Sequence, residues 1–294
     1  MIALVFLGGG ALVSTALWAG LQTAFRRSQA LRRRNYRDHE LPVASGVVIV
    51  LAVVLVQVTY SLIARTGGTS VAELARGATV VGGATVGFGF IGLFDDLAGG
   101  VTTKGFRGHL GALLHCEITT GMVKLVFGVV FGGLAVGQDL SGAVRGGLLI
   151  AATANLANLF DRAPGRVIKV SALGAVVIAV LGAPGWHLTG PMLVVGAGLG
   201  LLLPDLRERC MLGDTGANVL GAAIGWGLVI ALAGTGEWVA LGVMVALNVA
   251  SEFVSFSRVI DAVAPLRWID RWGALAERRQ FQATIRAVSG GRSI

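Results

Sequence analysis

The chain has 294 residues, of which 54% are hydrophobic and only 14% are charged, and its formal net charge is +8. A soluble domain carries roughly 25% charged residues, so this composition excludes an ordinary soluble protein and favours an integral membrane protein. The apolar residues also lack the short alternating segments of a membrane β-barrel. We therefore predict an all-α, polytopic bundle of transmembrane helices.

Nine apolar segments are long enough to cross a membrane. In chain order we predict spans at residues 2–25, 42–64, 77–94, 118–137, 143–160, 167–184, 188–204, 212–234 and 238–257. The basic cluster follows the first segment instead of preceding it, which favours a retained helix over a cleaved signal peptide. Residues 1–294 read as a single integral membrane domain, in which residues 258–294 form a polar cytoplasmic or membrane-surface tail.

The distribution of positive charge predicts the orientation of these spans. With the N-terminus outside, all but three of the 24 Lys and Arg residues fall on the cytoplasmic side, the exceptions being Arg65, Arg76 and Arg145. An odd number of spans then places the C-terminus inside. Orientation and anionic inner-leaflet lipid explain the basic excess, so nucleic acid is not an expected partner. The two cysteines, Cys116 and Cys210, are expected to be small buried or interfacial thiols.

The first candidate cluster is the adjacent pair Asp95 and Asp96, at the cytoplasmic end of the third segment. Two neighbouring carboxylates repel each other unless a cation or a proton relieves them, and hard oxygen ligands of this kind suit Mg²⁺ and phosphate chemistry. Lys104 and Arg107 follow as candidate contacts for phosphate oxygens. The alternative is a solvated helix end.

The second cluster consists of Asn155, Asn158 and Asp161, whose spacing of three places them on one broad helix face. Two amides and a carboxylate on one face can bind an ion or a polar head group. The alternatives are hydrogen bonds between helices by the Asn side chains, and an ion pair between Asp161 and Arg162 or Arg166.

The third cluster opens the eighth segment. Gly213 and Gly216 permit a tight turn and close approach of a ligand, and Asp214 lies between them. One interpretation puts Asp214 at a metal ion and free helix N–H groups toward a phosphate; the other makes Asp214 or Thr215 the helix cap. A fourth candidate is Glu252, for which two interpretations remain: a ligand of the site, or a member of a structural ion pair. Because the acidic clusters occupy separate cytoplasmic loop edges, we expect them to converge on one site at the membrane surface.

The order of these motifs resembles the polyprenyl-phosphate N-acetylhexosamine-1-phosphate transferase family. This family includes the translocase that makes the first lipid intermediate of peptidoglycan and the enzymes that prime teichoic-acid and O-antigen synthesis. The resemblance runs from about residue 37 to residue 270. The segments that carry it are residues 41–46, 92–96, 104–107, 155–161 and 211–216.

The resemblance implies an enzyme of the bacterial cell membrane whose active site faces the cytoplasm. A polyprenyl phosphate would attack a UDP-N-acetylamino sugar, releasing UMP and forming a polyprenyl-diphospho-sugar for the cell envelope, and members often form homodimers. Mg²⁺ is the implied cofactor, held by Asp214 and Asp161. The other implied roles go to Asp95 and Asp96 at the acceptor phosphate, to Lys104, Arg107 and Arg37 in substrate binding, and to Asn155 and Asn158 beside the metal or the nucleotide.

Three positions depart from the family's pattern. Gly99 stands where a Lys is usual, Pro164 stands where a second Asp is usual, and residues 265–273 contain Asp270 but no His cluster. These positions contact phosphate or nucleotide in the family. The alternative function is therefore a non-catalytic relative that binds a polyprenyl lipid or scaffolds envelope enzymes. A transporter is disfavoured because the carboxylates cluster at span ends and not in mid-span.

Overall fold

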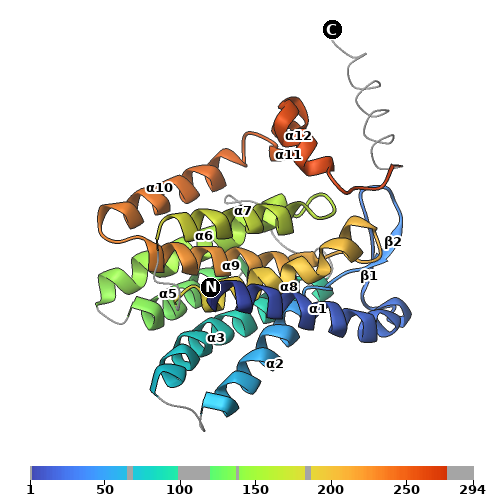
Figure 1. Ribbon diagram of the computed structural model, residues 1–294. Coiled ribbons are helices and arrows are strands. Elements are labelled where there is room, and N and C mark those ends of the chain that lie inside the picture. Colours follow the sequence, from blue (N-terminus) through green and yellow to red (C-terminus); the bar gives the residue numbers. More distant parts are fainter. Residues whose placement is uncertain (1, 65–68, 99–119, 137–138, 183–186, 277–294) are drawn as a thin grey trace.

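The protein is described by a computed structural model that covers residues 2–64, 69–98, 120–136, 139–182 and 187–276, and this part of the chain is mostly helical. Figure 1 shows the helices gathered into a bundle, with one small hairpin of strands at its edge. In chain order the elements are α1 (Ile2–Arg27), β1 (Arg32–Arg34), β2 (Glu40–Pro42), α2 (Val47–Ala64), α3 (Thr69–Ala98), α5 (Thr120–Val136), α6 (Leu140–Phe160), α7 (Arg166–Val180), α8 (Thr189–Leu206), α9 (Gly213–Ala231), α10 (Thr235–Ala250), α11 (Phe256–Ala262) and α12 (Ala264–Arg271).

Four of the described helices, α1, α6, α8 and α9, are long and apolar enough to cross a membrane, and α2 and α10 are shorter apolar helices. The outer faces of the bundle carry many exposed large apolar side chains, among them Leu12 on α1 and Val239 on α10. Such a surface is unusual for a soluble monomer and suits contact with lipid.

Helix α9 is the centre of the bundle. In an apolar stretch of 18 residues of α9, 78% of the residues are buried. The corresponding share in α1, which lies at the periphery, is 22%. It packs most extensively against α6 and α3, and it also contacts α7 and α8. Side chains on the first turn of α9 therefore lie among the ends of several helices.

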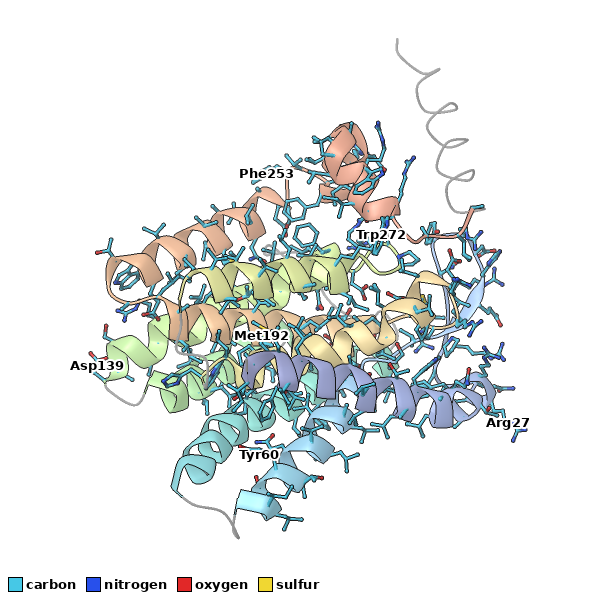
Figure 2. All side chains as sticks on the ribbon, viewed as in Figure 1. Arg27, Tyr60, Asp139, Met192, Phe253 and Trp272 are labelled. Carbon is cyan, nitrogen blue, oxygen red and sulfur yellow. The ribbon has the colours of Figure 1, made fainter. Side chains whose placement is uncertain are left out.

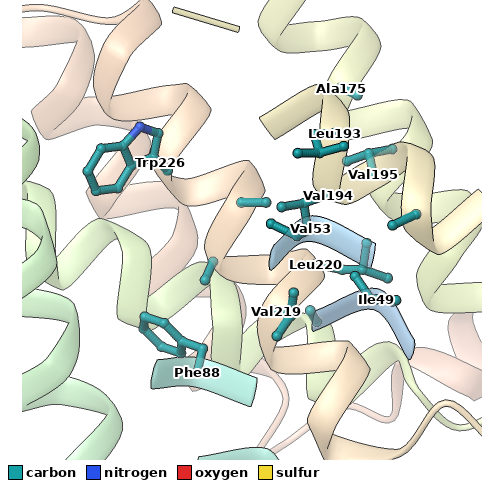
Figure 3. Close-up of a cluster of buried hydrophobic side chains, with 14 of the residues drawn as sticks. Ile49, Val53, Phe88, Ala175, Leu193, Val194, Val195, Val219, Leu220 and Trp226 are labelled. Carbon is teal, nitrogen blue, oxygen red and sulfur yellow. The ribbon is translucent and has the colours of Figure 1, made fainter. Parts of the chain in front are cut away.

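Apolar packing around α9 holds the bundle together. Figure 3 shows the cluster, with Phe88 of α3, Leu193 of α8 and Val219, Leu220 and Trp226 of α9 among its buried side chains. Elsewhere small residues bring helices close: a Cβ added at Gly128 of α5 would meet Ala151 of α6. Close approach through glycine is typical of helix pairs in membranes, where lipid offers no hydrophobic drive for association.

Each of the nine expected segments overlaps a helix, and the last overlaps both α10 and α11. Several boundaries differ: α3 begins at Thr69, eight residues before the expected 77, and two further differences have a visible cause. Residues 42–46 precede α2 because they are hydrogen-bonded to the segment before α9: Met211 N–H donates to Pro42 O (2.8 Å), and Gly46 N–H donates to Leu212 O (3.0 Å). At the other end, α10 stops at Ala250, seven residues before the expected end at 257, and α11 begins after a turn. Ser251 lies in that turn, and its hydroxyl bonds back to Asn248 O, a local bond that competes with helix continuation.

Two features of the expected cytoplasmic segments were not predicted as structure. The first is the antiparallel hairpin β1–β2, in which Arg33 faces Leu41. The second is the helix pair α11–α12, which is fastened to the start of α7. There Arg166 and Asp270, both almost fully buried, form an ion pair at 2.7 Å, and Lys169 Nζ donates to carbonyl oxygens at the end of α12. Figure 2 shows this end of the chain, with Trp272 labelled beyond α12.

Candidate functional site

The end of α3, the end of α6 and the start of α9 meet at one end of the bundle. This follows from the helix directions: α9 packs along both α3 and α6, and residues far apart in sequence are bonded to its first turn. Three of the predicted acidic positions, Asp96, Asp161 and Asp214, are thereby brought together. The predicted convergence of separate loop edges agrees with this arrangement.

Asp96, on α3, caps the N-terminus of α9. Its carboxylate accepts the N–H of Asp214 (2.9 Å), the N–H of Thr215 (3.0 Å) and the Thr215 hydroxyl (2.6 Å). Helix N-termini favour negative charge because their first N–H groups lack partners within the helix. The expectation that these N–H groups face a phosphate was therefore wrong for Asp214 and Thr215, since Asp96 already occupies them. The expectation that Asp214 or Thr215 caps the helix was also wrong, because the cap comes from α3.

Two glycines make this contact possible. Gly213 has a φ of 74°, which strains any residue with a side chain, and a Cβ there would also lie 2.6 Å from Asp96 Oδ2. On α3, a Cβ at Gly92 would lie 2.5 Å from the carbonyl carbon of Asp214 and from Thr215 Cα. Glycine is thus required on both sides of the seam between α3 and α9.

Arg33 of the β-hairpin holds the end of α3 in place. Its guanidinium donates to the carbonyl oxygens of Asp96 (2.9 Å) and Leu97 (3.3 Å). The last carbonyls of a helix lack partners within the helix, and a cation stabilises them. From the sequence, Arg33 is expected only as one of the cytoplasmic charges, and its contact with the end of α3 is evident only from the structure.

On the α6 side, Asn158 reaches Asp214 directly. Asn158 Nδ2 donates to Asp214 Oδ2 at 3.3 Å, while the Asn158 Oδ1 atom is buried without a hydrogen-bond partner. Asp161 ends α6, and its N–H bonds back to Ala157 O and Asn158 O. Asp95 lies beside Asp96 on the last turn of α3 and is partly buried.

Negative charge accumulates at this end of the bundle. Burial raises the pKa of Asp161 well above its ordinary value, and the carboxylates of Asp205, Asp214 and Asp96 raise it further, with Arg162 opposing them. Burial likewise raises the pKa of Asp96 to about 6, although its hydrogen bonds from Thr215 and Asp214 lower it. Carboxylates held this close need a proton or a cation to relieve their repulsion.

Asp205 was missed by the sequence analysis. It lies on the last turn of α8, is 4% exposed, and accepts the N–H of Gly165 at 2.7 Å. It thereby fixes the turn that joins Asp161 to α7, in which Gly165 has a φ of 71°. Asp205 directly follows the segment predicted at residues 188–204 and belongs to none of the motifs, so only its burial in the structure singles it out.

Two predicted substrate-binding residues have protein partners instead. Asn155 Nδ2 donates to Asn248 Oδ1 of α10 at 2.7 Å, which is the interhelical bond that the sequence analysis left open as an alternative. Arg37 donates to Glu208 through Nε (3.1 Å) and Nη2 (2.5 Å). Glu208 is buried and also binds Asn35 and Tyr36, so it anchors the hairpin to the end of α8.

The remaining predicted residues have varied positions. Lys104 and Arg107 lie outside the described residues. Arg166 pairs with Asp270 and not with Asp161, which removes one of the ion pairs considered for the second cluster. Glu252 is exposed, and within the described part of the chain its side chain has neither a hydrogen bond nor an ion pair, although its N–H donates to Val249 O.

A divalent cation fits the chemistry of this site only with help from neutral oxygens. No three His, Cys, Asp or Glu side chains among the described residues come together as a metal-binding group. Mg²⁺ is commonly bound by one or two carboxylates, with water and substrate phosphate completing its shell. Asp214 and Asp161 provide the carboxylates, and Asn158, whose Nδ2 donates to Asp214, has an unsatisfied neutral oxygen, Oδ1. The types of these donors, two carboxylates and a neutral amide oxygen, match those that Mg²⁺ prefers.

Comparison with protein-family models and with curated proteins finds no match to this chain.

Proposed function

We propose that this protein is a membrane enzyme that transfers a sugar-1-phosphate from a UDP-N-acetylamino sugar to a polyprenyl phosphate, with release of UMP. The observation that carries the proposal is the convergence of Asp96, Asp161 and Asp214 from three separate helix ends on one partly exposed, acidic site at the end of an apolar bundle. A lipid-linked phosphate and a water-soluble nucleotide can meet only at such a boundary.

The proposed topology has nine spans, with the N-terminus outside and the site on the cytoplasmic side. The two ends of the bundle differ in charge, and this difference supports the proposed orientation. Arg27 and Asp139 lie at opposite ends (Figure 2), and the Arg-rich hairpin follows Arg27. Arg145, close to Asp139 on α6, is one of the three basic residues expected outside, and there it pairs with Glu237 at 2.7 Å. The site lies at the end of α6 far from Arg145.

Asp214 and Asp161 would hold Mg²⁺. When bound, this ion supplies charge neutralisation at the donor diphosphate and at the leaving oxygen of UMP. Asn158 orients Asp214 through its hydrogen bond, and Asp96 with Thr215 fixes the turn on which Asp214 stands. Phosphoryl transfer depends mostly on positioning and charge, so a rigid first turn of α9 is the main contribution of the fold.

Asp95 is the carboxylate we assign to the acceptor phosphate, because both oxygens of Asp96 are already bound by α9. A phosphate monoester has a second pKa of about 6 and is largely dianionic at neutral pH. It needs no strong base, so the role we propose for Asp95 is electrostatic and not the removal of a proton. Lys104 and Arg107 remain the proposed cationic contacts for phosphate oxygens.

The test is UMP release by the purified full chain. The protein is given Mg²⁺, undecaprenyl or decaprenyl phosphate and a panel of UDP-N-acetylamino sugars, beside an Asp214→Asn variant of equal thermal stability. Release with one donor, lost in the variant, supports the transferase. No release from folded protein that still binds polyprenyl phosphate would instead favour a lipid-binding relative. The engagement of Asp270 by Arg166 is consistent with that alternative, since it gives the last loop a structural role.

A further inference from the structure

One face of α9 runs along α6 from the site into the bundle. Asp214, Asn218, Gly221 and Gly225 are spaced by four, three and four residues, which places them in one stripe of the helix. A Cβ at Gly221 would lie 2.6 Å from Ala154 Cα, and a Cβ at Gly225 would lie 2.7 Å from Ile150 Cα. At the other end of the stripe, Asp214 is bonded to Asn158. Asn218 therefore stands in this seam, one turn deeper than Asp214.

Asn218 has no explanation in the fold. Its side chain is 0% exposed, and among the described residues neither its amide oxygen nor its amide nitrogen has a hydrogen-bond partner. Asn158 Oδ1, at the mouth of the same seam, is also buried and unsatisfied. A buried amide without partners destabilises a folded protein, and polar groups inside a membrane bundle are functional candidates.

The two unsatisfied atoms of Asn218 indicate the nature of the missing partner. The amide oxygen needs a donor and the amide NH₂ needs an acceptor. A bare cation would satisfy only the oxygen, whereas water both donates and accepts. Mg²⁺ gives up its water reluctantly and usually keeps several molecules when only one or two carboxylates bind it. The seam thus has the polar groups to receive the water shell of an ion held at Asp214.

We infer that Asn218 is a positioning residue for a hydrated divalent cation at Asp214: its carboxamide, together with Asn158 Oδ1, hydrogen-bonds the water molecules that the ion retains. This inference rests on the proposed function, of which it details the metal site. In such a site ordered water takes the place of further acidic ligands. Residues that bind the groups around a metal typically change its affinity 10–100-fold when they are replaced.

Mn²⁺ binding to the purified full chain, followed by electron paramagnetic resonance without substrate, tests the inference apart from catalysis. Asn218→Leu has similar volume and removes the amide. We expect it to raise the Kd for Mn²⁺ about tenfold or more. The melting temperature of the metal-free protein should stay the same or rise, because an unsatisfied buried amide is lost. Asn218→Ala, with the same expected loss of affinity, serves if the leucine does not fit.

Ser14→Ala is the matched control. Ser14 on α1 is also fully buried with an unsatisfied hydroxyl, so its replacement should leave the Kd unchanged. A Kd for folded Asn218→Leu and Asn218→Ala within threefold of the unsubstituted protein would overturn the role of Asn218 while leaving the metal site intact. An unsubstituted protein that binds Mn²⁺ no more tightly than Asp214→Asn would overturn the metal site itself, and with it this part of the proposed function.

Discussion

Thr215 is the side chain that ties the two acidic helix ends together. It is fully buried, and both its hydroxyl and its N–H donate to Asp96. A hydrogen bond to a charged group contributes about 1.5–3 kcal/mol, more than most bonds in a protein. The geometry of Asp214, the preceding residue, depends on this bond.

Replacing Thr215 by Val should therefore impair the site without changing its shape. We expect UMP release to fall about tenfold, because the first turn of α9 loses a donor that fixes it against α3. Steady-state assays of Thr215→Val and Thr215→Ser measure the effect. The Ser variant keeps the hydroxyl and should stay within about threefold of the unsubstituted protein; equal losses in both variants would contradict this role.

Cys210 provides a test of burial at the same end of the bundle. It is 1% exposed, and burial raises the pKa of its thiol, with the Asp205 carboxylate adding to the effect. The thiolate is the reactive form, so the thiol should be inert at neutral pH. In a Cys116→Ser background, we expect maleimide to label Cys210 at least about tenfold more slowly in native membranes than after denaturation. Rapid labelling of the native protein would show that this end of the bundle is open.

At the scale of elements, the seam between α3 and α9 depends on Gly92. A methyl group there would meet the backbone of Asp214 and Thr215, which cannot move aside as a flexible side chain could. Gly92→Ala should lower the free energy of unfolding by about 1–3 kcal/mol, the usual cost of overpacking. Gly9→Ala on α1 is the control, since nothing lies within 4 Å of its added Cβ. Titration with SDS measures both, and equal stability of the two variants would contradict the close contact.

The α11–α12 pair is held by a buried ion pair, and this gives a second prediction at the same scale. Arg166→Met leaves the Asp270 carboxylate buried without its cation, which should cost about 3–5 kcal/mol. The double variant Arg166→Met, Asp270→Leu removes both charges and should recover most of that loss. SDS titration of the single and double variants closes the cycle; additive losses would show that the two side chains do not interact.

For the whole molecule, the long apolar segments of the sequence predicted where the helices lie. They did not predict the contacts between the helix ends. Apolar segments of sufficient length mark α1, α6, α8 and α9 clearly, because lipid imposes a length and a composition. The same rule does not apply to the short elements outside the apolar segments. The β1–β2 hairpin and the α11–α12 pair depend on particular partners, Glu208 and Arg166, that lie far away in sequence.

Only part of the candidate site could be predicted, because its contacts also join residues that lie far apart in sequence. Residue type and motif order singled out Asp96, Asp161 and Asp214, and the structure brings them together. They could not show that Asp96 occupies the N-terminus of α9, or that Asn155 turns toward α10. Nor could they single out Asp205 and Asn218, whose significance comes from burial and from missing or distant partners.

In the proposed reaction a sugar phosphate moves from a nucleotide to a membrane lipid. The most direct measurement uses a UDP-N-acetylamino sugar labelled in its β-phosphate, incubated with the purified chain, Mg²⁺ and polyprenyl phosphate, followed by organic extraction. Our account predicts that the label enters the lipid fraction together with the sugar, in step with UMP release, and that Asp214→Asn abolishes both. Label that stays in the aqueous phase with every donor, from a folded protein, would contradict the transferase.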